Sequence, residues 1–308
     1  TQIVKDLEGA LELYAAAGKL HTADPCDFDG MVAANYLMRA HMLMHEWEKA
    51  EDVSKLIVDN VPLATAAQLM QGFSDISLPN IVMGCDITAD NSGVYMSWFS
   101  QMDMFGDGYA GIGVWRAAFK PLVDRIADDD VRLKWFACDR STGIDSEDSP
   151  TGRVTLLGDV MMAAQVEYQS VKFIGAGRST VNSGVFDGWE LGDYIYLRSE
   201  EAYLIKAEAQ AHQKETADAL NTLNTFMKTR QPSYNFTNSE YAALVEEINY
   251  QKRVEFWGEG IVYLDNRRLN IPVDRTDETW GENNNHLAAA RMYVEQEGRN
   301  FLYQIPDN

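Results

Sequence analysis

Apolar residues recur at helical spacing from the start of the chain. Ile3, Leu7 and Leu11 share one face of a helix that should end near Ala17, because Gly18 is a natural stop. The same spacing returns on both sides of the polar pair at 45–46, first in Ala34, Leu37, Ala40 and Met44 and then in Trp47, Ala50, Val53 and Ile57. Residues 1–66 are therefore predicted to be helical, with the last two helices paired as a hairpin.

A second helical hairpin is predicted from "YLRSEEAYLIKAEAQA" to "ADALNTLNTFMKTR". Ala207 and Ala219 lie twelve residues apart in it, which is the separation of the small positions in a tetratricopeptide helix pair. In the first hairpin, Trp47, Ala50 and Pro62 also match that repeat. We therefore expect tetratricopeptide-like hairpins in both parts of the chain.

One more helix should open at "TNSE", where Thr237 and Glu240 have the spacing of a capping box, and it should end at Gly258.

Residues 67–193 follow a different pattern. Glycines punctuate them, as in "GDGYAGIG" and "GAGRST", and short strand-like pieces such as "RVTLL", "VEYQSVKFIG" and "YIY" replace long periodic segments. Aromatic residues are concentrated between 95 and 136: Tyr95, Trp98, Phe99, Phe105, Tyr109, Trp115, Phe119, Trp135 and Phe136. The chain is thus predicted to be one mainly α domain, with helical repeats at 1–66 and 194–308 around an irregular, aromatic-rich insertion at 67–193.

Composition removes several classes of function. The 308 residues carry 26 Lys plus Arg against 47 Asp plus Glu, a formal charge of −21 that repels nucleic acid and anionic lipid. No apolar run reaches the roughly 18 residues that a membrane span needs. Cys26, Cys85 and Cys138 are odd in number and widely spaced, so we expect buried thiols and neither a disulfide framework nor a zinc site.

The stretch "QKRVEFWGEGIVYLDNRRLN", residues 251–270, concentrates charge of both signs. Its basic residues are Lys252, Arg253, Arg267 and Arg268, and its acidic residues are Glu255, Glu259 and Asp265. In so acidic a chain we expect these charges to pair internally where helices meet, since buried charges need partners. The stretch is predicted to stabilise the fold and to take no part in ligand chemistry.

Several blocks of this sequence resemble consecutive blocks of the SusD/RagB family. They are "YIYLRSEEAYLIKAEAQA", "LNTLNTFMKTR", "INYQKRVEFWGEGIVYLDNRRLN" and "FLYQIPDN", and "NYLMRAHMLMHEWEKAEDVSKLIVDN" resembles an earlier helix pair of that family. Family members are typically longer, so the chain is similar to the C-terminal portion of a full-length member. The family's signal peptide, lipid-bearing cysteine and first repeats have no counterpart here.

The resemblance implies a function at the cell surface. SusD-like proteins are lipoproteins on the extracellular face of the outer membrane of Bacteroidetes. There they capture nutrients, usually glycans, for polysaccharide utilisation. They deliver them to a SusC-like TonB-dependent transporter. By this resemblance the chain would bind an oligosaccharide or other nutrient, partner such a transporter, and need no cofactor.

A glycan site requires exposed aromatic planes with polar groups around them. The insertion offers both, so the candidate ligand-binding residues are Tyr95, Trp98, Gln101, Tyr109, Trp115 and Arg116. We expect roughly two of the four aromatic side chains among them to serve the core, because tryptophan is usually mostly buried.

Catalysis and metal binding have little support in the sequence. No GxSxG, HExxH, Walker or GxGxxG signature occurs, and the pair His41 and His45 lacks a third ligand. The acidic runs 128–130 and 145–148 lack EF-hand spacing and read as solvated surface. We therefore predict a protein that is not an enzyme. The alternatives are a tetratricopeptide-like scaffold that binds only proteins and, less favoured, a glycosidase with two facing carboxylates.

Overall fold

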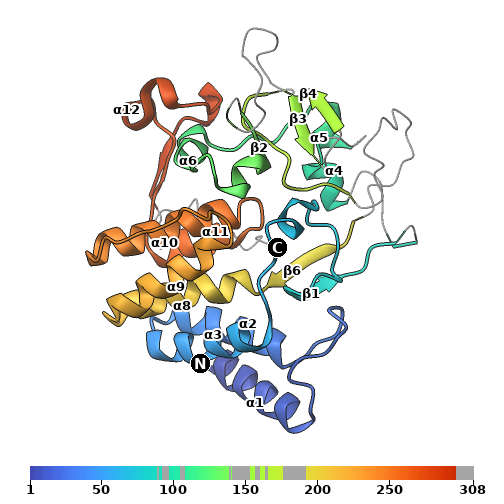
Figure 1. Cartoon of the computed structure of the whole chain (residues 1–308), viewed down its shortest axis with the longest axis vertical. Helices are drawn as coiled ribbons and strands as arrows, with labels where there is room; N and C mark the ends of the chain where they lie inside the picture. Colours follow the sequence, from blue (N-terminus) through green and yellow to red (C-terminus); the bar gives the residue numbers. More distant parts are fainter. Residues whose placement is uncertain are drawn as a thin grey trace, which may run out of the picture.

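The longer helices form one stacked group in a computed structural model of the chain (Figure 1). The structure describes residues 1–88, 90–91, 97–104, 108–138, 140, 153–156, 160–163, 166–175 and 192–295. The long helices are α1 (Gln2–Ala16), α2 (Gly30–Leu43), α3 (Trp47–Asn60), α8 (Glu200–His212), α9 (Thr216–Lys228), α10 (Tyr241–Glu255) and α11 (Ile261–Arg268). The prediction of a mainly helical chain is confirmed.

The two predicted hairpins lie against each other in this stack. Helix α2 packs on α3, α3 on α8 and α8 on α9, so α3 and α8 are neighbours although residues 61–199 separate them in sequence. Ala50, Ala207 and Ala219 are fully buried, as small residues at close helix approaches should be. The tetratricopeptide assignment of these hairpins stays a prediction.

The ends of the helices follow from local chemistry. Asp29 caps α2 by accepting a hydrogen bond from the Val32 N–H at 3.0 Å. His45, between α2 and α3, has a φ of 59°, and this left-handed residue terminates α2. The prediction of a capping box at Thr237 is wrong. Helix α10 begins at Tyr241 with Glu240 as its N-cap and has no side-chain cap, so residues 237–240 form a loop.

Short elements make up the upper part of the molecule in Figure 1. The short helices are α4 (Trp98–Met102), α5 (Tyr109–Ile112), α6 (Lys120–Asp124) and α12 (Asp277–Trp280), with 3-10 turns at Gln68–Met70, Val131–Trp135, Gly281–Asn283 and Ala288–Ala290. The strands of the described residues pair as antiparallel ribbons: β1 (Ile81–Cys85) with β6 (Tyr194–Arg198), β2 (Phe136–Ala137) with β5 (Gln169–Ser170), β3 (Arg153–Leu156) with β4 (Val160–Ala163), and β7 (Val273–Asp274) with β8 (Tyr293–Val294).

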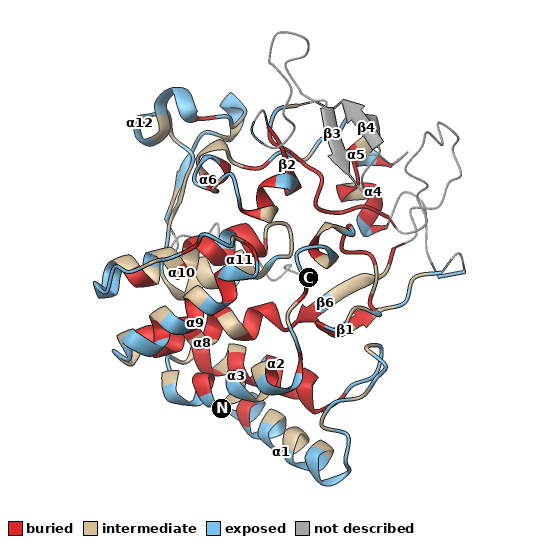
Figure 2. Cartoon of the chain, in the orientation of Figure 1, coloured by how far each residue is buried: buried red, intermediate tan, exposed pale blue. Residues whose placement is uncertain are grey.

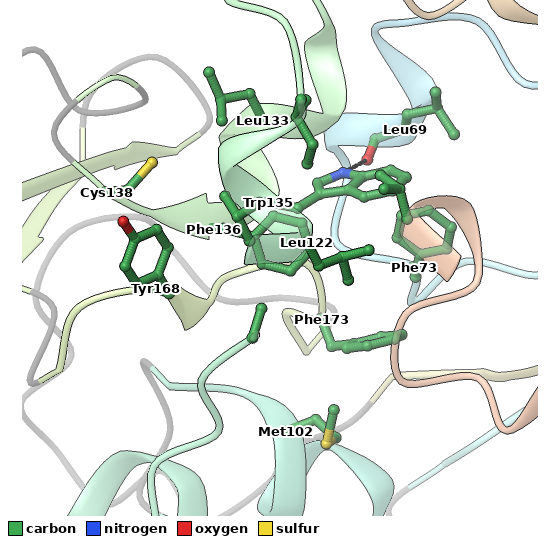
Figure 3. Packing of buried hydrophobic residues seen from close by; sticks show 14 of the residues in the cluster. Leu69, Phe73, Met102, Leu122, Leu133, Trp135, Phe136, Cys138, Tyr168 and Phe173 are labelled. Atoms are coloured by element: carbon green, nitrogen blue, oxygen red, sulfur yellow. Dashed lines mark hydrogen bonds between the residues drawn. The ribbon is translucent and has the colours of Figure 1, made fainter. Parts of the chain in front are cut away.

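An aromatic core joins the short elements to the helices. The Trp135 indole N–H donates to the Leu69 carbonyl at 3.0 Å, and Phe73 meets the Trp135 ring edge-on at 5.4 Å between centroids (Figure 3). The same cluster includes Tyr250 and Val254 of α10. Figure 2 shows that burial is concentrated where these elements meet, whereas α1 and α12 are mostly exposed.

Two surface expectations need correction. Cys138 is buried as predicted, but Cys26 is exposed and Cys85 half-buried, because both lie at the edge where the loop after α1 meets β1. In the acidic run 128–130, Asp130 is buried and accepts hydrogen bonds from Arg132, the closest at 2.7 Å, so this residue is a structural partner and not solvated surface. The run 145–148 lies outside the described residues.

Candidate functional site

A cavity of about 500 Å³ opens between α4, strand β6 and the turn that follows α10. Its size falls within the range of about 300–1,000 Å³ that is typical of small-molecule sites. The described lining residues come from distant parts of the chain: Phe73, Ser97, Trp98, Gln101, Phe173, Asp193, Tyr194, Ile195, Tyr196, Gly258, Glu259 and Gly260.

Aromatic rings supply most of the apolar surface of the cavity. Trp98 is 37% exposed and meets the Phe173 ring edge-on at 5.5 Å, and Phe173 in turn packs edge-on against Phe73 at 5.9 Å. Tyr196, on β6, is 50% exposed. The Tyr194 hydroxyl accepts a hydrogen bond from the Trp98 backbone N–H at 3.0 Å, which ties α4 to β6. The cavity therefore presents two large, accessible ring planes over a packed aromatic floor.

The backbone is unusual at two lining positions. Phe73 has a φ of 54°, a left-handed conformation that costs a bulky residue roughly 1–2 kcal/mol. Gly258 has a φ of 82°, and a Cβ atom there would lie 2.7 Å from Phe173 Cε2. The turn after α10 thus needs glycine both for its conformation and for its close approach to the aromatic floor.

The inner wall of the cavity is a salt-bridged cluster around Glu259. One carboxylate oxygen of Glu259 accepts from Lys172 Nζ at 2.5 Å and from Arg198 Nη2 at 2.9 Å, and the other accepts from Arg198 Nε at 2.8 Å. Lys172 also donates to the carbonyls of Glu255 at 2.8 Å and Trp257 at 3.0 Å. These contacts fix the turn at 258–260 against residues 171–175 and β6.

Charge pairing continues behind this wall. The buried charge network consists of Asp130, Arg132, Lys172, Arg198, Glu200, Arg230, Glu255 and Glu259, which are four cations and four carboxylates. Glu255 is its centre, with guanidinium nitrogens of Arg198 at 2.8 Å, Arg230 at 3.0 Å and Arg132 at 3.2 Å. Equal numbers of each sign make this large interior cluster electrically neutral.

The pKa values in the network follow from burial and pairing. Burial lowers the pKa of the Lys172 ammonium to about 8, although Glu259 opposes the change. Burial opposes ionisation of Glu259 and Glu255, but the neighbouring cations outweigh it and lower the pKa of both carboxyls, that of Glu255 well below 4.5. Both carboxylates are therefore ionised at neutral pH.

The prediction of internal pairing in 251–270 is confirmed for Glu255, Glu259 and Arg268, and it is wrong for Arg253. Arg268 pairs with Glu208 at 2.7 Å, close to Lys252, which contacts the same carboxylate at 2.6 Å. Arg253 is exposed and has no ion pair among the described residues, because it lies on the outward face of α10. The stretch also lines the cavity through residues 258–260, so its position is not purely interior.

The structure brings some of the predicted ligand-binding residues together. Trp98 and Gln101 line the cavity, and Arg116 reaches it indirectly by donating to Gln101 Oε1 at 3.2 Å. Tyr109 and Trp115 are 42% and 41% exposed, but they are not among the residues that line the cavity. Tyr95 lies outside the described residues.

Sequence reasoning missed the partners of Trp98. Phe173, Tyr194 and Tyr196 reach the cavity from segments some 75 to 100 residues further along the chain, and Gly258 and Gly260 from still further. One available signal was the alternation in "YIYLR", which places Tyr194 and Tyr196 on the same face of a strand.

The histidine pair and the acidic run have protein partners instead of a metal-like arrangement. His41 is buried and lies 2.6 Å from Glu46 Oε2, while His45 stacks on Trp47. Over the part of the chain that the structure describes, no group of three or more potential metal ligands is gathered.

Residues 166–308 match the model of the SusD family. This C-terminal part of the chain belongs to the SusD family. A search among curated proteins found no match. The structure of the chain is similar to a SusD-like carbohydrate binding protein from Bacteroides vulgatus, with 24% identity and a TM-score of 0.69 over 99% of this chain and 62% of that one. A second SusD superfamily protein from B. vulgatus gives 17% identity and a TM-score of 0.70 over 99% and 61%. A SusD superfamily protein from Bacteroides thetaiotaomicron is 17% identical, with a TM-score of 0.62 over 96% of this chain and 60% of that one.

These likenesses show that the chain has the fold of the solved SusD-like structures. The chain spans about three fifths of the length of those structures. Within its described residues, none of the helices combines the length and apolar character that crossing a bilayer requires.

Proposed function

We propose that this SusD-family chain binds glycans without cleaving them, and that the cavity beside Trp98 holds part of the glycan. The observation that carries the proposal is the pair of accessible rings, Trp98 and Tyr196, at a cavity of about 500 Å³. A sugar presents an apolar C–H face that stacks on such rings, and Gln101 offers an amide at the same cavity. One structural relative is described as a carbohydrate binding protein, which agrees with this assignment.

The remaining candidate residues extend the proposed site outward. Tyr109 begins α5, and its backbone N–H donates to Ser100 Oγ of α4 at 3.4 Å, while Arg116 donates to Gln101 Oε1. Together with Trp115 they supply exposed aromatic and polar groups near the cavity that a longer oligosaccharide could contact. Tyr95 remains a candidate from its sequence position alone.

The carboxylates at the cavity support a non-catalytic role. Glycoside hydrolysis requires one carboxyl group that is protonated and can give its proton to the leaving oxygen. Glu259 is held ionised by Lys172 and Arg198. Asp193 accepts backbone N–H groups at both oxygens, from Ile87 at 3.0 Å and Ile76 at 3.1 Å. Neither group is arranged as a proton donor to a bound sugar.

Membership of the SusD family supports a further part of the proposal, the cellular role. The chain would act on the extracellular face of the outer membrane as part of a lipoprotein and pass its ligand to a SusC-like TonB-dependent transporter. Co-purification of the native protein with such a transporter from mild detergent tests this role. Repeated isolation without a transporter would contradict it.

The binding proposal is tested by an oligosaccharide array followed by calorimetry. Trp98→Ala should abolish measurable binding, while Trp115→Ala, which removes an equally exposed ring from outside the cavity, should weaken binding much less. Equal losses would move the site away from the cavity. If no oligosaccharide binds at millimolar concentration, the protein-binding scaffold is favoured. If shortened oligosaccharides appear, a glycosidase is favoured.

A further inference from the structure

We propose that the cavity selects neutral sugars over acidic ones, an inference that rests on the proposed glycan-binding function. The observation behind it is the state of the charged groups at the cavity. Among the described lining residues the charged ones are Asp193 and Glu259, and every oxygen of both already accepts a hydrogen bond from the protein. Lys172 and Arg198 balance the charge of Glu259, whereas Asp193 accepts only backbone N–H groups, so among the described residues no cation at the cavity is available to a bound anion.

The cations behind the wall are equally committed. The Lys172 ammonium has three N–H donors and three acceptors: Glu259 Oε1 and the carbonyls of Glu255 and Trp257. Its side chain is fully buried, and Nζ lies 4.8 Å from the centroid of the Phe73 ring and 5.1 Å from that of the Phe173 ring. An acidic ligand could reach this ammonium only by displacing one of these partners.

Arg198 shows the same saturation. Its five N–H donors make four hydrogen bonds: Nε at 2.8 Å and Nη2 at 2.9 Å to the Glu259 carboxylate, Nη1 at 2.8 Å to the Glu255 carboxylate, and Nη2 at 2.8 Å to the Glu255 carbonyl. In addition, Nη1 lies 3.2 Å from Glu200 Oε2 in an ion pair. Because the buried charge network holds four charges of each sign, no net positive field points into the cavity to compensate a bound anion.

An acidic sugar would therefore lose the hydration of its carboxylate without gaining a cationic partner. Transfer of an unpaired ionised group out of water is far more costly than transfer of a hydroxyl, which can bond to Gln101 or keep water at the open side. The net charge of −21 further disfavours approach of an anion. Arg116 does not line the cavity; it donates to Gln101 Oε1 and to the Val114 carbonyl, and it forms no ion pair among the described residues.

The test compares two forms of one ligand on the same protein. The neutral oligosaccharide that binds best on the array is oxidised at C6 to the uronic acid, and both forms are titrated by calorimetry at pH 7. We expect the uronic acid to bind at least about tenfold more weakly, since it must bury an unpaired carboxylate. The variant Gln101→Lys places a cation at the cavity and should favour the uronic acid relative to the neutral form.

The outcomes separate this inference from the proposed function. If no form binds, the glycan-binding function fails and the inference falls with it. If the uronic acid binds as well as or better than the neutral form and Trp98→Ala abolishes that binding, the function stands and the inference is overturned. Loss of this acidic preference in Arg116→Gln would then identify Arg116 as the anion contact. Tight binding of an acidic sugar that Trp98→Ala leaves unchanged would overturn both the inference and the proposed cavity site.

Discussion

Replacement of Glu255 by glutamine should destabilise the protein strongly. The Glu255 carboxylate is fully buried and contacts the guanidinium groups of Arg132, Arg198 and Arg230. Glutamine preserves its shape but removes its charge, and its amide group directs two N–H donors toward cations that are themselves donors. The buried charge network would be left with four cations and three carboxylates.

The size of the effect follows from that imbalance. Loss of one partner from a buried ion pair typically costs about 3–5 kcal/mol, because an uncompensated charge stays behind in the interior. Glu255 is shared by three cations, so several of the remaining bonds must rearrange together. We therefore expect the free energy of unfolding to fall by at least about 3 kcal/mol, a large part of the roughly 5–15 kcal/mol of a typical domain.

Urea unfolding at pH 7, followed by circular dichroism and by tryptophan fluorescence, measures this loss. Arg253→Gln is the matched control, since Arg253 is an exposed charged residue of the same helix and its replacement should change the free energy by less than about 0.5 kcal/mol. A loss below about 1 kcal/mol in Glu255→Gln, or equal losses in the two variants, would refute the reasoning.

Three shorter predictions follow from the same structure. In the folded state, the pKa values of Glu255 and Glu259 lie below the ordinary 4.5. The stability that these carboxylates contribute is therefore present above about pH 4.5 and is lost as the pH falls through their folded-state pKa values. Acid unfolding should be steeper in the wild type than in Glu255→Gln. Gly258→Ala should lower the unfolding midpoint more than Gly260→Ala, because both residues have a φ near 80° but only at Gly258 would a Cβ atom meet a side chain; equal midpoints would contradict this. In a thiol titration of the native protein, Cys26 and Cys85 should react first, and Cys138 should react only after denaturant is added. Fast reaction of all three thiols in the native protein would contradict the burial of Cys138.

The helices could be predicted from sequence because their signals are local. The apolar spacing from Ile3 placed a helix that should end near Ala17, and α1 spans Gln2–Ala16. The error at Thr237 has a related cause: a capping box requires only two residues three apart, and such a pair also occurs in loops, as it does before α10. Local patterns specified the elements better than their exact ends.

The candidate site was predicted only in part, because its residues come from distant parts of the chain. Density of aromatic residues pointed to Trp98 and Gln101, but nothing local in the sequence indicates that Phe173 and Tyr196 face them. The partners of Glu255 were also hidden, since Arg132 precedes it by more than one hundred residues and Arg198 by more than fifty. Sequence showed that the charges in 251–270 needed partners, and only the fold shows which residues supply them.

One wall of the cavity is fixed by the buried charge network, and another carries the exposed Trp98 ring. Residues 171–175, β6 and the turn at 258–260 are joined through Glu259 by several charge-assisted bonds, so this side is formed before any ligand arrives. Trp98 belongs to the five-residue helix α4, whose Phe99 and Met102 are buried in the core, but its own ring is 37% exposed and contacts Phe173 edge-on. A preformed wall lowers the ordering cost of binding, and a partly exposed ring has room to adjust to different sugars. Adjustment to ligand is therefore expected at the Trp98 side chain, while selection against negative charge belongs to the fixed wall.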